Sequence, residues 1–340
     1  MKLHSPALPR QTTLLIALSI TFILTLVGCG TTAQTSTPAA KRPIHVQLAW
    51  VHTIEYSGFY TAQDQGYYDA ANLDVSLDVL GQTSPIDQVV MGKAQFGMAS
   101  ADNVLLARAT GKPVVAIATI YQRSPVAFVS LAKNHIIKPQ DFINKTVIVD
   151  LKGTTGIIYR ALLASQSINE AQVKTQPRAD YTNDALLNGK ADVIDAFINN
   201  QPVQLKQQGY DINVVLPSDY GIDLYANVIF TTEEMIKTQP DVVEAFVRAT
   251  TRGMQRAIQD PEAATRLTLA RGTDLNPTAE ATSMRLALPL MNPAGSQPGM
   301  MTAANWQTAY QILHDQGLLA QQLDVQQAYT LTFLDKVYSK

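Results

Sequence analysis

The sequence predicts an α/β fold in two lobes, each a mainly parallel β-sheet flanked by helices. Its 340 residues are enough for two hydrophobic cores. From residue 44 onward, short apolar stretches alternate with longer segments of helical periodicity. A faint repeat aligns GKAQFGMA at 92–99 with GKADVIDA at 189–196, an offset of 97 residues. The repeat favours two lobes of similar topology, with chance similarity of two helix–glycine–strand units as the alternative.

The first set of elements runs from residue 44 to residue 121. The pattern predicts strands at 44–49, 73–80, 94–99 and 114–121, and helices at 57–65, from Ser84 to Gly92 and from Asp102 to Gly111. Ser84 followed by Pro85 is a typical helix start, because serine caps and proline occupies the first helical position. Glycines at the ends of the helical segments indicate where they stop. The β-branched run at 114–121 is typical of a buried strand.

A second set begins near Asp141. Strands are predicted at 146–150, from Val173 and at 191–198, with helices from Gly153 to Ser165, at 182–187 and at 202–208. From Thr232 on the pattern is helical, with helices expected at 241–259, 261–270, 280–289 and 303–316. Strands that alternate with helices favour parallel pairing.

The N-terminal residues predict an export signal. Lys2 and Arg10 precede the uncharged run 13–27, which leads to Leu-Val-Gly and then Cys29. This order resembles the lipobox of bacterial lipoproteins, in which the cysteine is acylated and becomes the new N-terminus. The resemblance implies a cleaved signal at 1–29 and a lipid anchor on the extracytoplasmic face of the cell membrane. An uncleaved anchor is the alternative, but the run is shorter than the roughly 20 residues that span a bilayer.

Composition excludes several classes of function. Residues 30–43 contain no bulky apolar side chain and predict a flexible tether. The formal net charge of −2 argues against nucleic acid as a partner. Cys29 is the only cysteine, so no internal disulfide is expected. The five histidines have no metal-ligand spacing and G-x-S-x-G is absent, so we expect no metal, no cofactor and no enzymatic activity.

Seven short segments together resemble the solute-binding proteins of ABC importers. They are QLAW at 47–50, EYSGFY at 55–60, GYY at 66–68, LDV at 73–75, GKAQFG at 92–97, GKPV at 111–114 and DYGID at 219–223. The most similar group handles thiamine pyrimidine precursors (the NMT1/THI5-like proteins), with relatives for riboflavin, sulfonates and nitrate. The resemblance spans residues 44–264.

This resemblance implies a periplasmic-binding-protein-like fold of type II, with the ligand between two lobes that close about a hinge. Lobe one would comprise 44–125 and 225–340, and lobe two 126–224. The hinge crossings would lie near Ser124–Pro125 and Asp223–Leu224. A monomer that delivers its ligand to a permease and an ATPase subunit is expected.

The candidate ligand contacts in lobe one begin at a strand–helix junction. Trp50, Tyr56 and Tyr60 could stack on a flat ring, or they could pack in the core. Glu55 could accept hydrogen bonds from an aminopyrimidine, or serve the start of a helix. Asp102 is expected either to cap its helix or to face the cleft.

The remaining candidates lie at the hinge and in lobe two. Gln122 follows a buried strand near the first crossing. Thr154 and Thr155 belong to a Gly-Thr-Thr-Gly turn whose free amides attract an anion or a polar ring edge. Asn200 begins an Asn-Gln-Pro segment, in a position where close relatives have Asn-Glu-Pro. Tyr220 could cover a ring of the ligand, and Asp223 is a candidate hydrogen-bond acceptor.

The expected ligand is a small heterocycle. The mixture of aromatic and carboxylate residues favours a pyrimidine-like thiamine precursor over a small oxyanion, which would need more Arg, Lys or helix-start amides. Riboflavin is an open alternative, as are sulfonate or nitrate. A synthase-like enzyme of the thiamine pyrimidine type is a less favoured alternative, because such relatives rely on a cysteine-rich iron-binding stretch that this chain lacks.

Overall fold

The computed structural model describes residues 40–319 and 322–339. The predicted signal peptide, the predicted acylation site Cys29 and most of the predicted tether therefore lie outside the described residues. The first strand already begins at Arg42, inside the range predicted for the tether. Within the described ranges, none of the helices combines the length and the apolar character that crossing a bilayer requires.

The first sheet has five strands in the order β2-β1-β3-β10-β4. They are β1 (Arg42–Gln47), β2 (Leu73–Asp78), β3 (Phe96–Ala99), β4 (Val114–Thr119) and β10 (Val228–Thr232). β1 pairs in parallel with both β2 and β3. β10 runs antiparallel to both β3 and β4, so the other four strands share one direction.

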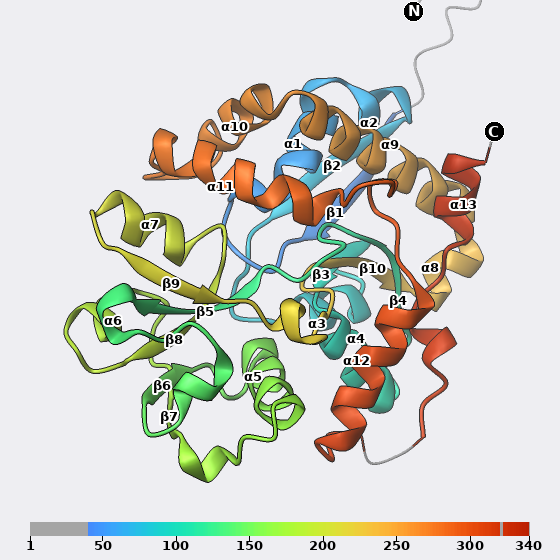
Figure 1. The fold of residues 1–340 in the computed structure, drawn as a ribbon. Helices are drawn as coiled ribbons and strands as arrows, with labels where there is room; N and C mark the ends of the chain where they lie inside the picture. The colour runs from blue at the N-terminus through green and yellow to red at the C-terminus, as the bar shows by residue number, and fades with distance from the viewer. Residues whose placement is uncertain (1–39, 320–321, 340) are drawn as a thin grey trace, which may run out of the picture. The chain divides into compact units, whose positions relative to one another are not determined.

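The second sheet also has five strands, in the order β7-β6-β8-β5-β9. They are β5 (Val126–Leu131), β6 (Thr146–Val149), β7 (Lys174–Pro177), β8 (Val193–Phe197) and β9 (Ile212–Val215). β5 is the antiparallel member, as β10 is in the first sheet. Figure 1 shows these strands in green and yellow, and the strands of the first sheet other than β10 in blue and teal.

The two sheets correspond strand for strand, which confirms the α/β fold with mainly parallel sheets. The central strands β3 and β8 are the pair that the 97-residue repeat aligned. Gly92 and Gly189 precede them and have φ angles of 72° and 71°. Both glycines end a helix in the left-handed conformation, which a side chain would strain. The repeat is therefore a repeat of structure.

Three strands were missed from the sequence. Val126–Leu131 is buried along its whole length, so it shows no alternation that would separate it from a buried helix. β9 has four residues, too few for a periodic signal. β10 lies at the start of a stretch that reads as helical, and it enters the first sheet only after the chain has passed through the second.

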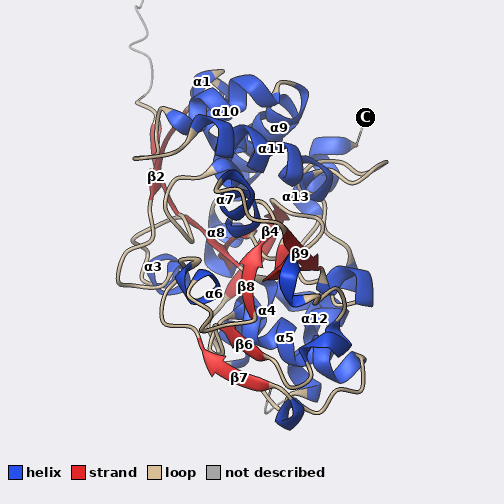
Figure 2. Cartoon of the chain, turned by 60° about the vertical axis from the view of Figure 1, so that its left-hand side comes forward, coloured by secondary structure: helices blue, strands red, loops and turns tan. Residues whose placement is uncertain are grey.

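Thirteen helices cover the two sheets in the described part of the chain (Figure 2). They are α1 (Ser57–Asp64), α2 (Tyr67–Ala70), α3 (Pro85–Val90), α4 (Ala101–Ala109), α5 (Thr154–Ser165), α6 (Asp184–Leu187), α7 (Gln201–Gln207), α8 (Glu233–Thr238), α9 (Pro240–Gln259), α10 (Pro261–Leu269), α11 (Pro277–Met291), α12 (Ala303–Asp315) and α13 (Thr332–Tyr338). Ser84 caps α3 as predicted and accepts from the amide of Asp87. The predicted cap at Asp102 is wrong, because α4 begins one residue earlier and Ser100 holds the N-cap position.

The core of the first sheet is built around α1 and α9. Phe246 of α9 stacks on Phe96 of β3, with ring centroids 3.8 Å apart. Gly253 of α9 lies against the backbone of Gly58 in α1, where a Cβ would come within 2.2 Å of the Gly58 carbonyl oxygen. The two helices therefore pack backbone to backbone at this point.

Two segments connect the sheets, between β4 and β5 and between β9 and β10. They are bonded to each other: Asp223 accepts from the amide of Ser124 at 2.6 Å and lies 3.6 Å from the Arg123 guanidinium. Short parallel crossings of this kind are typical of hinges. We keep the predicted division of the chain into two lobes as an interpretation of this topology.

Candidate functional site

A cavity of about 920 Å³ lies between residues of the two sheets. Its wall includes Trp50 and Ser100, which follow β1 and β3, and Asp150 and Arg178, which follow β6 and β7. Ligands of open α/β sheets bind at the carboxyl ends of parallel strands. Both sheets turn these ends toward the same cavity, so a ligand here would touch both lobes.

One aromatic side chain from each lobe meets at this cavity. Trp50 and Tyr181 approach edge to face, with ring centroids 5.5 Å apart. They are 39% and 49% exposed, far more than the aromatic residues of the core. Tyr181 also donates to Asp150 at 2.8 Å and has the Arg178 guanidinium over its ring. Two rings that are held in place but not buried suit a flat ligand.

A buried ion pair supports the lobe-two wall. The Nη1 atom of Arg178 lies 2.6 Å from Oδ1 of Asp195, and their side chains are 4% and 2% exposed. Thr155 donates to Asp195, and Arg178 donates to the carbonyl of Thr182. Because each charge is paired and hydrogen-bonded, the pair fixes the turn that carries Tyr181.

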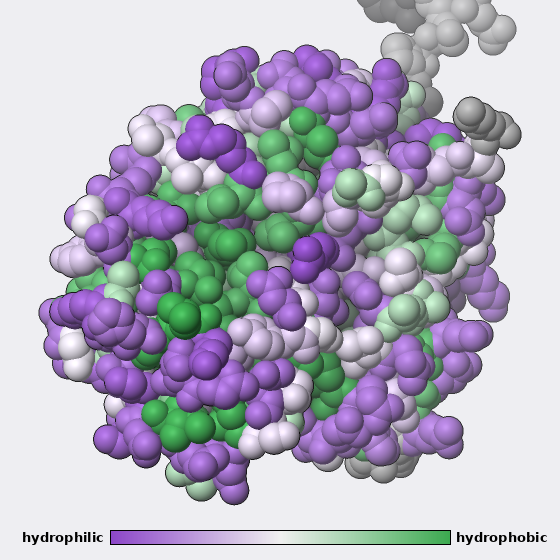
Figure 3. All heavy atoms as spheres, in the orientation of Figure 1, coloured by the Kyte–Doolittle hydropathy of each residue, from purple (hydrophilic) through white to green (hydrophobic). Residues whose placement is uncertain are grey.

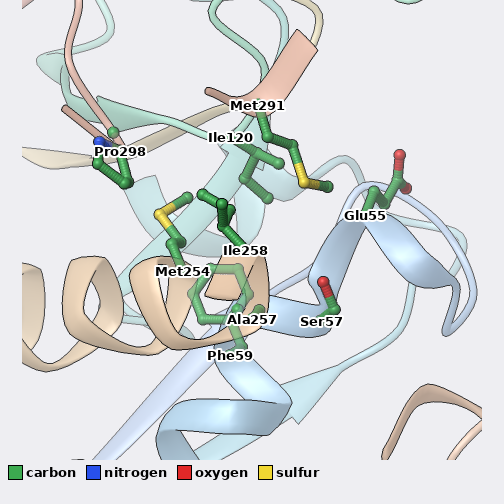
Figure 4. Close-up of a pocket in the computed structure, with 11 residues that line it drawn as sticks. Glu55, Ser57, Phe59, Ile120, Met254, Ala257, Ile258, Met291 and Pro298 are labelled. Carbon is green, nitrogen blue, oxygen red and sulfur yellow. The ribbon is translucent and has the colours of Figure 1, made fainter. Parts of the chain in front are cut away.

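Glu55 supplies a buried carboxylate at the lobe-one end. It is 8% exposed and accepts from Nδ2 of Asn227 at 2.9 Å. Burial raises the pKa of Glu55, and the hydrogen bond from Asn227 partly opposes this effect. Figure 4 shows the Glu55 carboxylate pointing away from an apolar hollow of about 10 Å³, at whose wall Met254 and Met291 lie. A hollow of this size is at the lower limit for one water.

Direct hydrogen bonds join the two lobes beside the cavity. Thr154 of α5 donates to both carboxylate oxygens of Asp102, at 3.1 and 2.9 Å, and its hydroxyl lies 2.8 Å from that of Ser100. Asp102 is fully buried, and this burial raises the pKa of its carboxyl group. Asp102 therefore contacts the opposite lobe and does not line the cavity.

Five predicted residues do line the cavity: Trp50, Glu55, Thr154, Thr155 and Asn200. Figure 3 shows apolar side chains gathered between α11 and the strands of the second sheet, with polar side chains around them. That Trp50, Glu55, Thr154, Thr155 and Asn200 contact a ligand stays a prediction.

The other predicted residues have different neighbours. Tyr56 and Tyr60 are completely buried in the first core, where Tyr60 bonds to His52 at 2.9 Å. Gln122 donates to the carbonyls of Met291 and Gln297 and so joins the hinge to the C-terminal segments. Asp223 is engaged across the hinge, where burial raises the pKa of its carboxyl group. Tyr220 packs against the core outside the cavity wall.

Sequence reasoning missed several residues of the wall. Among the polar and aromatic ones are Asp150, Arg178, Tyr181, Asp195, Asn199, Asn227 and Glu280. Asp150 had a usable signal, because it stands at the carboxyl end of the strand predicted at 146–150. Asp195 lies in the middle of β8, so its place on a predicted strand gave no such signal. Glu280 had none, since it opens a helix more than 200 positions after Glu55. Among the described residues, no group of His, Cys, Asp and Glu could hold a metal ion.

Comparison with known proteins places the chain in a family. The family model described as "NMT1/THI5 like" matches residues 53–264. The riboflavin-binding protein RibY of Chloroflexus aurantiacus is 29% identical, with 94% of this chain and 97% of that protein covered. The formylaminopyrimidine-binding protein of Halalkalibacterium halodurans is 26% identical, with coverages of 91% and 95%. A 4-amino-5-hydroxymethyl-2-methylpyrimidine phosphate synthase of Legionella pneumophila is 24% identical, with coverages of 88% and 95%.

Solved structures identify the fold. The sulfonate-binding protein SsuA of a putative ABC transporter from Methylobacillus flagellatus superposes with a TM-score of 0.68 at 14% identity, over 88% of this chain and 94% of that one. The alkanesulfonate-binding protein SsuA from Xanthomonas axonopodis pv. citri gives 0.68 at 11% identity, over 86% and 99%. At such identities the likeness concerns the fold, which is that of the periplasmic binding proteins. With the family model matched over residues 53–264, the chain belongs to the NMT1/THI5-like family.

Proposed function

We propose that this protein is the solute-binding component of an ABC importer and captures a small nitrogen heterocycle between its two lobes. One observation carries the proposal: Trp50 and Tyr181, one from each lobe, meet at the wall of a cavity that both lobes line. A ring that contacts both side chains gains contacts in both lobes only when the lobes are closed. Ligand binding would therefore favour the closed state, which a permease can recognise.

A pyrimidine precursor of thiamine, of the hydroxymethyl- or formylaminopyrimidine type, is the first candidate ligand. The Glu55 carboxylate can accept hydrogen bonds from an amino group, and the relative from H. halodurans is named for binding formylaminopyrimidine. Apart from the paired Arg178, the cavity wall has few cationic groups, which does not suit a sulfonate or nitrate.

Riboflavin is the second candidate. The relative with 29% identity is named for riboflavin binding. The cavity of about 920 Å³ lies at the upper end of the roughly 300–1,000 Å³ typical of ligand sites, so a three-ring ligand fits its size.

We infer that the protein binds its ligand without converting it. The relatives with the higher identities are named as binding proteins, although a synthase is among the more distant ones. The described residues offer no cluster of metal ligands for redox chemistry. Mass spectrometry after prolonged incubation should recover one unchanged ligand per chain, and a product with altered mass would contradict the inference.

Membrane attachment through Cys29 belongs to the same proposal, since an importer's binding protein works at the outer face of the membrane. Cys29→Ser should release the protein from the membrane fraction, with loss of acyl mass at the N-terminus. Retention of that variant in the membrane would point to an uncleaved anchor instead.

The decisive test is titration calorimetry and thermal shift with the purified protein. The panel would contain aminopyrimidine precursors, thiamine, riboflavin, taurine and nitrate. Saturable binding of a pyrimidine or of riboflavin at one per chain supports the proposal and selects between the two candidates. Binding of taurine or nitrate alone would contradict the proposal that the ligand is a heterocycle, but it would not affect the assignment of the fold.

A further inference from the structure

Hydrogen-bond acceptors are concentrated where α11 packs against the segment Ile54–Tyr56 of the same lobe. Glu55 and Glu280 both line the cavity there. Burial raises the pKa of Glu55, and the charge of Glu280 adds a smaller effect in the same direction. The pKa of Glu280 is also raised by burial. Its Oε2 atom is buried and has no hydrogen-bond partner in the described chain.

Lobe two adds a third acceptor. Asn199 follows β8, lines the cavity and is 7% exposed. Its Nδ2 atom donates to the hydroxyl of Tyr121 at 3.1 Å, which leaves Oδ1 as the open atom. Within the described residues Oδ1 has no partner and is buried.

The three acceptors belong to one neighbourhood. Tyr121, which Asn199 contacts, has its pKa raised by burial and then by the charges of both Glu55 and Glu280. Helix α11, which carries Glu280, packs against the segment Ile54–Tyr56 and against α7, which begins two residues after Asn199. The wall here thus receives oxygen acceptors from η1 (Ile54–Tyr56), from α11 and from the opposite lobe.

Such an arrangement of acceptors favours a ligand that carries hydrogen-bond donors. A buried acceptor without a donor costs about 1–3 kcal/mol. Nδ2 of Asn227 serves Oε2 of Glu55, whereas Oε2 of Glu280 and Oδ1 of Asn199 have no hydrogen-bond partner among the described residues. A ligand with N–H groups removes that cost, whereas a carbonyl or sulfonate oxygen placed against these two atoms would be repelled by their like partial charges.

We propose that Glu280 and Asn199, together with Glu55, form the end of the site that recognises a ligand amino group, and that Glu280 determines specificity for it. This rests on the proposed function, whose cleft it uses. A primary amino group on a ring carries two N–H bonds that diverge, so one can serve Glu280 while the other serves Asn199. A single ring substituent would thereby be recognised by both lobes at once.

The test compares two ligands of the same size. Calorimetry would measure the affinity of the protein for 4-amino-2-methylpyrimidine and for its 4-oxo counterpart, and would include riboflavin and taurine. Glu280→Gln keeps the shape of the side chain but removes the charge and one acceptor. Glu262→Gln, at an exposed position in the first turn of α10, is the matched control. Circular dichroism would verify that both variants melt as the unmodified protein does.

We expect the unmodified protein and Glu262→Gln to bind the amino compound about tenfold or more tightly than the oxo compound, since a hydrogen bond to a charged group contributes roughly 1.5–3 kcal/mol. Glu280→Gln should lose most of this preference. An unchanged preference in Glu280→Gln overturns the inference, as does equal or tighter binding of the oxo compound. If riboflavin binds and the amino compound does not, the inference fails while the proposed function stands. If nothing binds, both fail.

Discussion

Trp50 and Tyr181 illustrate how a binding residue differs from a core residue. Both remain well exposed although they touch each other across the cavity, so replacing either leaves both hydrophobic cores intact. Trp50→Ala should weaken ligand binding at least tenfold, or about 1.4 kcal/mol, with little change in melting temperature. Tyr210→Ala, at an exposed tyrosine outside the cavity wall, is the control. Equal affinity of the Trp50 and Tyr210 variants would remove Trp50 from the site.

The same residues mark how far sequence reasoning reached into the site. Trp50 and Glu55 could be found because an aromatic and a carboxylate stand together at one strand–helix junction. Tyr181 could not, because nothing in its local sequence separates it from a tyrosine on a surface turn. Its place at the cavity depends on the buried pair of Arg178 and Asp195, which join only after β7 and β8 have taken their positions in the sheet.

At the scale of elements, the packing of α1 on α9 depends on two glycines. A Cβ at Gly253 would lie 2.2 Å from the Gly58 oxygen and 2.6 Å from the Ala62 Cβ, so the helices must move apart. Gly253→Ala should lower the free energy of unfolding by about 1–3 kcal/mol, as overpacked cores do. Gly81→Ala is the control, because its Cβ meets open space. Chemical denaturation would compare the two, and equal stabilities would contradict backbone contact between the helices.

The elements that sequence predicted share a property that the missed ones lack. The predicted helices carry their own signals, such as Ser84 before Pro85 at the start of α3. The predicted strands stand next to such helices. β5, β9 and β10 have no capping signal beside them and no alternation of polar and apolar residues. Each obtains its hydrogen bonds from strands distant in sequence. The parallel β–α units could therefore be predicted, while the antiparallel strand of each sheet required the tertiary structure.

At the scale of the whole molecule, buried acids couple folding to pH. The pKa of Asp102 and that of Glu55 are raised by burial in the folded state. The folded chain therefore holds protons that the unfolded chain has released, and the free energy of unfolding falls as pH rises from the ordinary carboxyl pKa of about 4 through the raised values. Asp102→Asn should flatten this fall, as urea denaturation at pH 5 and pH 8 would measure. If the free energy of unfolding falls equally steeply in Asp102→Asn, the pH dependence does not come from Asp102.

Closure of the two lobes should depend on one hydroxyl group. Thr154 contacts Asp102 and Ser100 across the lobes, so Thr154→Val leaves the buried Asp102 carboxylate without its partner from lobe two. We expect the closed state to become less populated and the apparent affinity to fall by the same factor, about tenfold for a lost bond to a charged group.

Because Thr154 also lines the cavity, closure must be measured without ligand, for example by the distance between spin labels on α4 and α5. Thr154→Ser keeps the hydroxyl and should restore the unmodified distance. Thr175→Val removes a bond to Tyr159 within lobe two and should leave closure unchanged. If Thr154→Val and Thr175→Val give the same distance distribution, the hydroxyl of Thr154 does not hold the lobes together, and any loss of affinity in Thr154→Val is a direct loss of ligand contact.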